Sequence, residues 1–295
     1  MSIKIRLARK SDRVPIVEFC KNTFSWGDYI EDAWDEWLED PRGALYVSDY
    51  DNENAIGLAH VSLCPDKQNI WIEGVRVRHD YRRLNVASEL IQRMIDFGIG
   101  KGASDALGIV SDANAASRRM IEKLGFLPIS DWAYFGIDQR LATAKTDCRI
   151  ASTDDVDHVL RYLDSSKVFA LSAGRFMDSW KWYKITKLVL HAFARKDRLV
   201  VYGEPIEGLA MLNTEGYWNR KGILQVAYLD GASSKALYHL VNHVTKFYAD
   251  GNFDRLQVLC HLSLAAKIPQ FRLKNPEHFI LYCRNIEGRS ESESD

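Results

Sequence analysis

The chain has 295 residues, of which 46% are hydrophobic and 27% are charged, and its formal net charge is −1. This length is sufficient for two domains of ordinary size, each with a buried core. The balanced charge supplies no positive field that would attract nucleic acid or an anionic membrane, so we expect neither as a partner. No apolar run approaches the roughly 20 residues of a membrane-spanning helix, and the N-terminus lacks the apolar block of a signal peptide. The five cysteines are scattered without a Cys-x-x-Cys pair, which favours a reduced, cytoplasmic setting.

Hydrophobic periodicity predicts strands and helices in the order βααβββαβαβ over the first half of the chain. The expected strands cover residues 3–7, 44–48, 55–63, 70–77, 105–111 and 126–137. The expected helices follow Ser11, span residues 28–38, begin near Val86 and span residues 113–124. This order is typical of an α+β fold, in which helices flank a mixed sheet.

Residues 71–90 read as a strand, a basic turn and the start of an amphipathic helix. Gly74 interrupts the strand pattern, which predicts a β-bulge, although a packing glycine is the alternative. After Tyr81-Arg82-Arg83, a helix would begin with unpaired backbone N–H groups beside two guanidinium groups. Such a corner binds anions, and phosphate above all.

The sequence Arg82-Arg83-Leu84-Asn85-Val86-Ala87 resembles the acetyl-CoA pyrophosphate loop of the GNAT superfamily of N-acetyltransferases, Arg/Gln-x-x-Gly-x-Gly/Ala. Arg82 and Ala87 match, whereas Asn85 stands at the first glycine. Because Asn tolerates a positive φ better than most residues, we expect the turn to form. The resemblance implies a V-shaped split in the sheet and acetyl-CoA as cosubstrate. It implies that the cosubstrate is held by Val75, Val77, Arg82, Arg83, Leu84, Asn85, Val86, Ala87, Ser88, Asn114 and Ser117.

Beyond the first half of the chain, the sequence pattern of its strands and helices begins again. Residues 149–155 follow residues 6–12 at an offset of 143, and Asp178-Ser179-Trp180 echoes Asp32-Ala33-Trp34. We therefore predict a tandem GNAT fold in two copies: a catalytic domain at 1–138, a linker at 139–146, a degenerate GNAT-like domain at 147–286 and a disordered tail at 287–295. Where the first copy has its arginines, the second has Asp230, which would repel a diphosphate. One acetyl-CoA site per chain is expected.

Acetyl transfer to an amine requires a base, because amines are mostly protonated near pH 7. Glu73 lies where several GNAT enzymes that act on small amines place this base. The alternative is a structural ion pair of Glu73 with Arg76 or Arg82. The run from Asn114 to Phe126 resembles the family's Asn-x-x-Ala…Tyr-Glu-Lys-Leu-Gly-Phe helix, but Ile121 stands where a tyrosine often protonates the thiolate. Either another residue serves, with Tyr134 as the candidate, or the thiolate leaves unprotonated.

The acceptor side is expected to be lined by Trp26, Asp28, Tyr29 and Trp37. This segment resembles GNAT proteins that include the vertebrate histidine N-acetyltransferase-like enzymes, which implies an amino acid or another small amine as acceptor. An aromatic and acidic pocket would suit a cationic amine. The alternative is that the tryptophans belong to the core, which helical spacing favours for Trp34. His239 and His243 lie four residues apart without an identifiable third ligand, so no metal is expected.

The sequence thus predicts an acetyl-CoA-dependent N-acetyltransferase of a small amine, either a monomer or a homodimer. Acetylation of a protein N-terminus or of a lysine is a second enzymatic reading. A non-catalytic acyl-CoA sensor is a third reading, motivated by Asn85 and Ile121.

Overall fold

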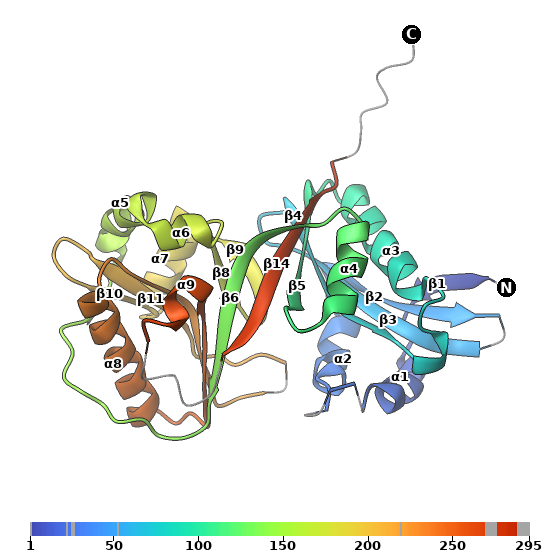
Figure 1. The fold of residues 1–295 in the computed structure, drawn as a ribbon, viewed down its shortest axis with the longest axis horizontal. Helices are drawn as coiled ribbons and strands as arrows, with labels where there is room; N and C mark the ends of the chain where they lie inside the picture. The colour runs from blue at the N-terminus through green and yellow to red at the C-terminus, as the bar shows by residue number, and fades with distance from the viewer. Residues whose placement is uncertain are drawn as a thin grey trace, which may run out of the picture. The chain divides into compact units, whose positions relative to one another are not determined.

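The structure, a computed structural model, describes residues 2–21, 23–24, 27–51, 53–218, 220–268 and 276–287. The described residues fall into two compact units (Figure 1). The first holds those within Met1–Val110, those of Asn114–Pro128 and those from Tyr282 onward. The second holds Ser111–Ala113 and those within Ile129–Leu281. The domain bounds expected from the sequence stay a prediction, and the tail beyond residue 287 lies outside the described residues.

The first unit is a sheet with neighbouring strands in the order β1-β2-β3-β4-β5. The pairs from β1 to β4 are antiparallel, whereas β4 and β5 are parallel. Its strands are β1 (Ile3–Leu7), β2 (Gly43–Tyr50), β3 (Glu53–Leu63), β4 (Asn69–Val77) and β5 (Asp105–Ser111). Its helices are α1 (Arg13–Cys20), α2 (Ile30–Leu38), α3 (Val86–Gly100) and α4 (Ala115–Lys123), with short 3-10 turns at Lys10–Asp12 and His79–Tyr81.

The helices cover both faces of these strands. On β3, Gly57 lies against Val86 of α3, whereas His60, three residues further on, stacks on Trp37 of α2. Side chains an odd number of residues apart point to opposite faces of a strand, so α3 and α2 pack on different faces. The apolar stripe of α2 buries Trp34 and Trp37 completely, which confirms the core reading for Trp34.

Strand β4 is bulged at Gly74. Glu73 pairs with His60 and Arg76 pairs with Leu58, so two residues of β4 face one residue of β3. Gly74 has φ +67°, and a Cβ there would lie 2.5 Å from the indole of Trp37. The bulge expected at Gly74 is therefore confirmed, and the position requires glycine for both its φ and its contact.

The parallel strands β4 and β5 pair only over residues 69–71 and 105–107. Both strands continue beyond this point without further pairing to each other, so the backbone of the second half of β4 has no ladder partner on the β5 side. This is the V-shaped split that the sequence predicted, and the bulge at Gly74 lies on its edge.

Strand β14 (Glu277–Asn285) contributes its last residues to the first unit. The Tyr282 hydroxyl donates to Glu122 of α4 at 2.8 Å, and Arg284 donates to the carbonyl of Leu124 at 2.8 Å. The amide of Ile286 donates to the carbonyl of Ser104 at 2.7 Å. Residues at the end of the chain thus complete a unit built mainly from its beginning, which hydrophobic periodicity did not predict.

The second unit repeats the arrangement, with strand order β6-β13-β12-β11-β10-β7. These strands are β6 (Leu127–Ile137), β7 (Arg149–Ile150), β10 (Leu199–Tyr202), β11 (Gly208–Asn213), β12 (Ile223–Gly231) and β13 (Arg255–His261). A separate hairpin joins β8 (Arg175–Asp178) and β9 (Lys181–Lys184). The helices are α5 (Val156–Ser165), α6 (Lys167–Leu171), α7 (Lys187–Arg195), α8 (Ser234–Asp250) and α9 (Leu262–Ala265), with a 3-10 turn at Thr153–Asp155.

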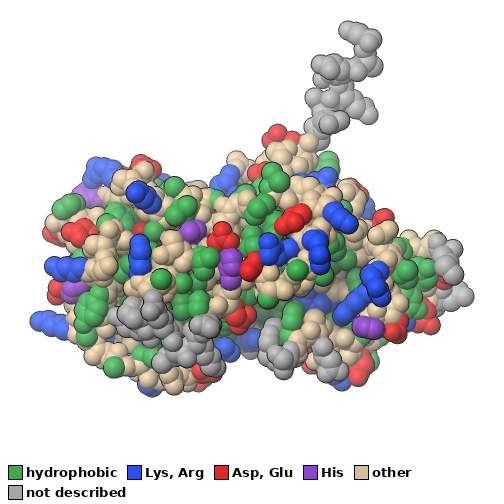
Figure 2. Space-filling view, in the orientation of Figure 1, with side chains coloured by type: hydrophobic (Ala, Val, Ile, Leu, Met, Phe, Trp, Pro, Cys, Tyr) green, Lys and Arg blue, Asp and Glu red, His purple; other side chains and the backbone are tan. Residues whose placement is uncertain are grey.

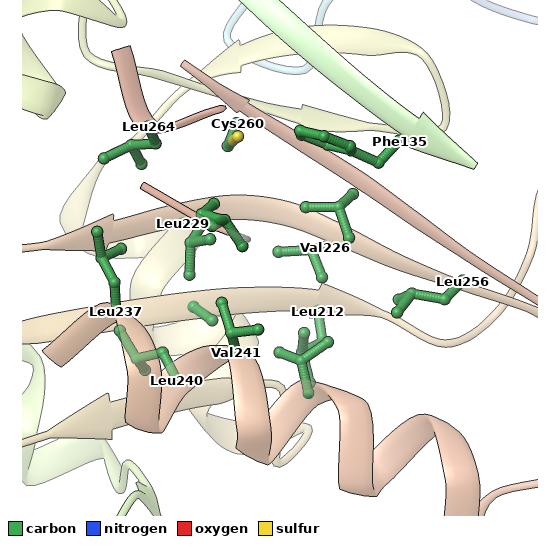
Figure 3. Packing of buried hydrophobic residues seen from close by; sticks show 14 of the residues in the cluster. Phe135, Leu212, Val226, Leu229, Leu237, Leu240, Val241, Leu256, Cys260 and Leu264 are labelled. Carbon is green, nitrogen blue, oxygen red and sulfur yellow. The ribbon is translucent and has the colours of Figure 1, made fainter. Parts of the chain in front are cut away.

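The core of the second unit lies between α8 and the strands. Leu237, Leu240 and Val241 of α8 meet Leu212 and Val226 of the sheet (Figure 3). Strands β12 and β13 are parallel and pair only over residues 223–226 and 255–258, and the register between β11 and β12 shifts at Ala227. The same short parallel pair and the same bulge therefore occur in both units, as two copies of one fold require.

None of the described helices combines the length and the apolarity needed to cross a bilayer. On the face shown in Figure 2, Lys and Arg side chains are interspersed with Asp and Glu, in keeping with the net charge of −1.

Candidate functional site

The basic turn after β4 opens onto the N-terminus of α3. Asn85 precedes the helix with φ 64° and ψ 5°, which is the left-handed conformation that the turn requires. The expectation that Asn85 can replace a glycine here is confirmed. The amide of Glu89 donates to the carbonyl of Asn85, so the amides of Val86, Ala87 and Ser88 have no acceptor within the helix.

Beside this helix start lies a hollow of about 520 Å³, lined by His79, Asp80, Arg82 and Arg83. The Nε of Arg82 donates to the carbonyl of Val77 at 3.3 Å, which ties the side chain to the end of β4. Arg83 has φ 66°, a second left-handed residue in the turn. The hollow thus holds two guanidinium groups beside the carboxylate of Asp80. That these groups and the amides at the start of α3 form a cradle for a diphosphate stays a prediction.

Glu73 lies on β4 next to the bulge, with its side chain 7% exposed. Its Oε1 is 3.0 Å from Nδ1 of His60 on β3. Arg76, one of the two arginines that the sequence suggested as alternative partners, binds Asp28 with both Nε (2.7 Å) and Nη2 (3.1 Å). Sequence reasoning missed the contact of Glu73 with the imidazole of His60 because His60 lies in an apolar strand.

The Asp28–Arg76 pair dominates the predicted acceptor side. The guanidinium of Arg76 lies over the rings of Phe24 (4.9 Å) and Tyr29 (5.3 Å). Burial raises the pKa of Tyr29 to about 12, with further contributions from Glu73 and Asp28 against the opposing effect of Arg76. Because Arg76 neutralises Asp28, this carboxylate does not supply the free negative charge that we expected to attract a cationic amine.

Trp37 packs against Tyr29 and His60. Its side chain is 1% exposed, its ring stacks on His60 with centroids 4.8 Å apart, and it meets Tyr29 edge-on at 5.8 Å. A direct contact of Trp37 with an acceptor stays a prediction. Trp26 lies outside the described residues.

Residues 14–126 match the sequence profile described as Acetyltransferase (GNAT) family. The first half of the chain contains a GNAT-family domain. No curated protein sequence matches the chain.

Solved structures extend the GNAT fold to the whole chain. A GCN5-related N-acetyltransferase from Sphaerobacter thermophilus is 11% identical, with a TM-score of 0.66, and the match covers 97% of this chain and 96% of that protein. A tandem GNAT protein from the clavulanic acid biosynthesis pathway is 8% identical, with a TM-score of 0.58 and complete coverage of both chains. At these identities the likeness establishes the fold, and the fold is a tandem GNAT.

In the GNAT domain, Asn114 caps α4. Its Oδ1 accepts a hydrogen bond from the amide of Ser117 at 3.1 Å, as a helix cap does. Ile121, where many GNAT enzymes have tyrosine, is 5% exposed and belongs to the core. Val75 and Val77 lie on the half of β4 that pairs with β3 but not with β5, and both are partly exposed. Contacts of these residues with CoA stay predictions.

Tyr134, the candidate general acid, belongs to the second unit. Its ring packs against Trp180 (5.2 Å) and Phe279 (6.4 Å), and its hydroxyl lies 3.4 Å from Nε2 of Gln257. Burial raises the pKa of Tyr134 to about 12, so the phenol holds its proton at neutral pH. Its role in protonating a thiolate stays a prediction.

The second GNAT copy carries an anion of its own at the end of β12. Asp230 is 1% exposed and accepts hydrogen bonds from the hydroxyls of Tyr162 (3.0 Å), Ser166 (2.5 Å) and Tyr228 (3.0 Å). Burial raises its pKa despite these bonds. That this carboxylate opposes the binding of a second diphosphate stays a prediction.

Among the described residues, no group of three or more His, Cys, Asp or Glu side chains is arranged to hold a metal ion. His239 stacks on Tyr202 at 4.7 Å, and its Nδ1 accepts from the amide of Asp147. These contacts account for His239 by packing and hydrogen bonding.

Proposed function

We propose that the protein is an N-acetyltransferase that moves the acetyl group of acetyl-CoA to a primary amine of a small molecule, such as an amino acid or a polyamine-like compound. One observation carries the proposal: the strand that leads into the basic turn and helix start also presents a nearly buried carboxylate, Glu73, beside its bulge. A donor cradle and a candidate base therefore share one strand, along a split that leaves its backbone free. The GNAT-family match of this region supports the same reading.

In this mechanism the amides of Val86, Ala87 and Ser88, together with Arg82 and Arg83, hold the diphosphate. The bound thioester supplies an activated acetyl group. Glu73 accepts a proton from the substrate ammonium, directly or through one water, so that the neutral nitrogen attacks the carbonyl carbon. The C–N bond forms as the C–S bond breaks, and the nitrogen releases its second proton to solvent as the amide forms. The thiolate takes a proton from a general acid, for which Tyr134 is the candidate, or leaves unprotonated.

The test is a screen for release of free CoA thiol against amino acids and polyamines, followed by Glu73→Gln. We expect this variant to lower kcat by about 10²-fold or more while the Kd for acetyl-CoA stays within about twofold. Glu18→Gln, on the exposed face of α1, is the matched control and should be silent. Unchanged turnover in Glu73→Gln would remove Glu73 from the role of base.

The same screen separates the other readings. Turnover confined to peptides with a free N-terminus or a lysine would indicate a protein acetyltransferase. Acetyl-CoA binding without thiol release above background would indicate a sensor. A cytoplasmic location and a monomeric or homodimeric state stay predictions.

A further inference from the structure

His60 lies between two carboxylates in the interior of the first unit. The side chain is 0% exposed, Nδ1 is 3.0 Å from Oε1 of Glu73, and Nε2 is 3.4 Å from Oδ2 of Asp40. The second distance is typical of an ion pair and long for a hydrogen bond. Both ring nitrogens therefore face an acidic oxygen, and the ring plane is fixed by the stack on Trp37 at an interplanar angle of 7°.

Asp40 is itself held in place. Its Oδ1 accepts from the amide of Arg42 at 2.9 Å, and Gly43 allows the carboxylate to approach β3, since a Cβ there would lie 2.5 Å from Oδ2. Burial opposes ionisation of Asp40, but its interactions with His60, with the amide of Arg42 and with Ser62 outweigh it and lower the pKa of Asp40 well below its usual range. Asp40 is thus a fixed negative charge on the side of His60 away from Glu73.

The arrangement decides where protons reside. A neutral imidazole has one N–H and one lone pair, so between two carboxylates its lone pair would face an anion. An imidazolium donates Nδ1–H to Glu73 and carries a positive charge between two negative ones, with Nε2 at ion-pair distance from Asp40 but without a hydrogen-bond acceptor. The contact of Nδ1 with Oε1 of Glu73 fixes one oxygen of this carboxylate against β3.

We propose that His60 is a positioning residue: held by Asp40, it donates Nδ1–H to Glu73, fixes the orientation of that carboxylate and keeps it ionised for proton abstraction. This inference rests on the proposed role of Glu73 as the base. It adds to that role two residues, on β3 and after α2, that do not touch the reacting atoms.

Other titratable groups near Glu73 stay fixed over the neutral range. The pKa of Tyr29 is about 12, so its phenol remains protonated. Burial opposes the charge on Arg76, but Tyr29 and the bound Asp28 outweigh it and raise the pKa of Arg76, which remains cationic. Asp40, whose pKa lies well below its usual range, also stays ionised over the neutral range.

The first test measures kinetics in His60→Phe and His60→Gln. Phe keeps the stack on Trp37 and removes the donor, whereas Gln keeps an N–H without the charge. We expect kcat to fall by about 10- to 100-fold in His60→Phe and by less in His60→Gln, with the Kd for acetyl-CoA within about twofold of the wild type. Because both variants lose the cation beside Glu73, the acidic limb of the pH profile of kcat/KM should move to higher pH.

Glu73→Gln separates the positioning role of His60 from the role of Glu73 as the base. If it is inactive while His60→Phe retains the wild-type kcat and pH profile, the positioning role is overturned and the proposed function stands. If Glu73→Gln is fully active, the base assignment itself fails. A loss in both His60 variants that follows thermal stability alone, without a shift in the pH profile, would indicate a purely structural residue and overturn the inference.

The second test needs no substrate. The chain has eight histidines, and in protein labelled with ¹⁵N-histidine the His60 signals are those lost in His60→Phe. We expect Nδ1 of His60 to carry a proton at neutral pH in the wild type, because it faces Glu73. In Asp40→Asn, which keeps an acceptor oxygen but removes the charge, the chemical shift of Nε2 should change. A wild-type His60 without a proton on Nδ1 at neutral pH would overturn the proposal.

Discussion

Gly74 offers the sharpest test of how β4 and α2 are built together. In Gly74→Ala the new Cβ meets two unfavourable conditions, a φ of +67° and an approach of 2.5 Å to the six-membered ring of Trp37. A left-handed conformation costs a residue with a Cβ about 1–2 kcal/mol. Overpacking in a close-packed core adds about 1–3 kcal/mol. The free energy of unfolding of the first unit should therefore fall by about 2–5 kcal/mol.

The chain supplies a matched control for this substitution. Gly102, at the end of α3, has φ +73°, but a Cβ there meets nothing within 4 Å. Gly102→Ala should cost only the backbone part, about 1–2 kcal/mol. Urea unfolding of both variants, followed by tryptophan fluorescence, measures the difference. If Gly74→Ala were no more destabilising than Gly102→Ala, the contact between the bulge and Trp37 would not have the role described here.

Three further outcomes are expected. Arg82→Ala should raise the Kd for acetyl-CoA by about tenfold in calorimetry, with less effect at high salt, whereas the control Arg195→Ala on α7 should not change it. Equal Kd values for the two variants would argue against the cradle. Asn85→Gly should leave the unfolding free energy within about 0.5 kcal/mol of the wild type, whereas Asn85→Val should lower it by about 1–2 kcal/mol, because valine resists a positive φ; equal stabilities would contradict the left-handed assignment. Burial opposes ionisation of Asp12, but the hydrogen bond from Arg6 outweighs it and lowers the pKa of Asp12. The ionised Asp12 therefore stabilises the fold above its unfolded-state pKa near 4, and this stabilisation is lost as the pH falls through its folded-state pKa. In melting curves Asp12→Asn should be less stable at pH 7, and its stability should change less with pH below about 4; an unaltered acid slope would refute this.

The sequence predicted features that depend on local backbone chemistry. Gly74 predicted a bulge because a glycine inside a strand pattern often marks one. Asn85 predicted a left-handed turn because Asn adopts a positive φ more readily than most other non-glycine residues. The repeat was visible because both copies keep the same strand and cap residues near their starts. Each of these signals can be read from a short stretch of the sequence.

Features that depend on distant residues were not predictable in the same way. His60 reads as one polar residue in an apolar strand, and its role follows only when β3 brings it opposite Glu73 and the turn after α2 brings Asp40 to its other side. Asp28 read as a free acidic group until the fold placed Arg76, 48 positions away, against it. Periodicity reports which face of an element is buried, and it carries no information on which partner is met there.

The strand at the end of the chain has a consequence for biosynthesis. Tyr282, Arg284 and Ile286 bond to α4 and to the start of β5 in the unit that begins at the N-terminus. During translation the hydrogen bonding of the proposed catalytic half is therefore complete only after residue 286 has been synthesised, although domains usually fold as they emerge. A chain that stops short of residue 282 leaves a strand edge of this unit open, and an open edge is a template for aggregation. Folding of the donor-site unit is in this way coupled to synthesis of the second unit.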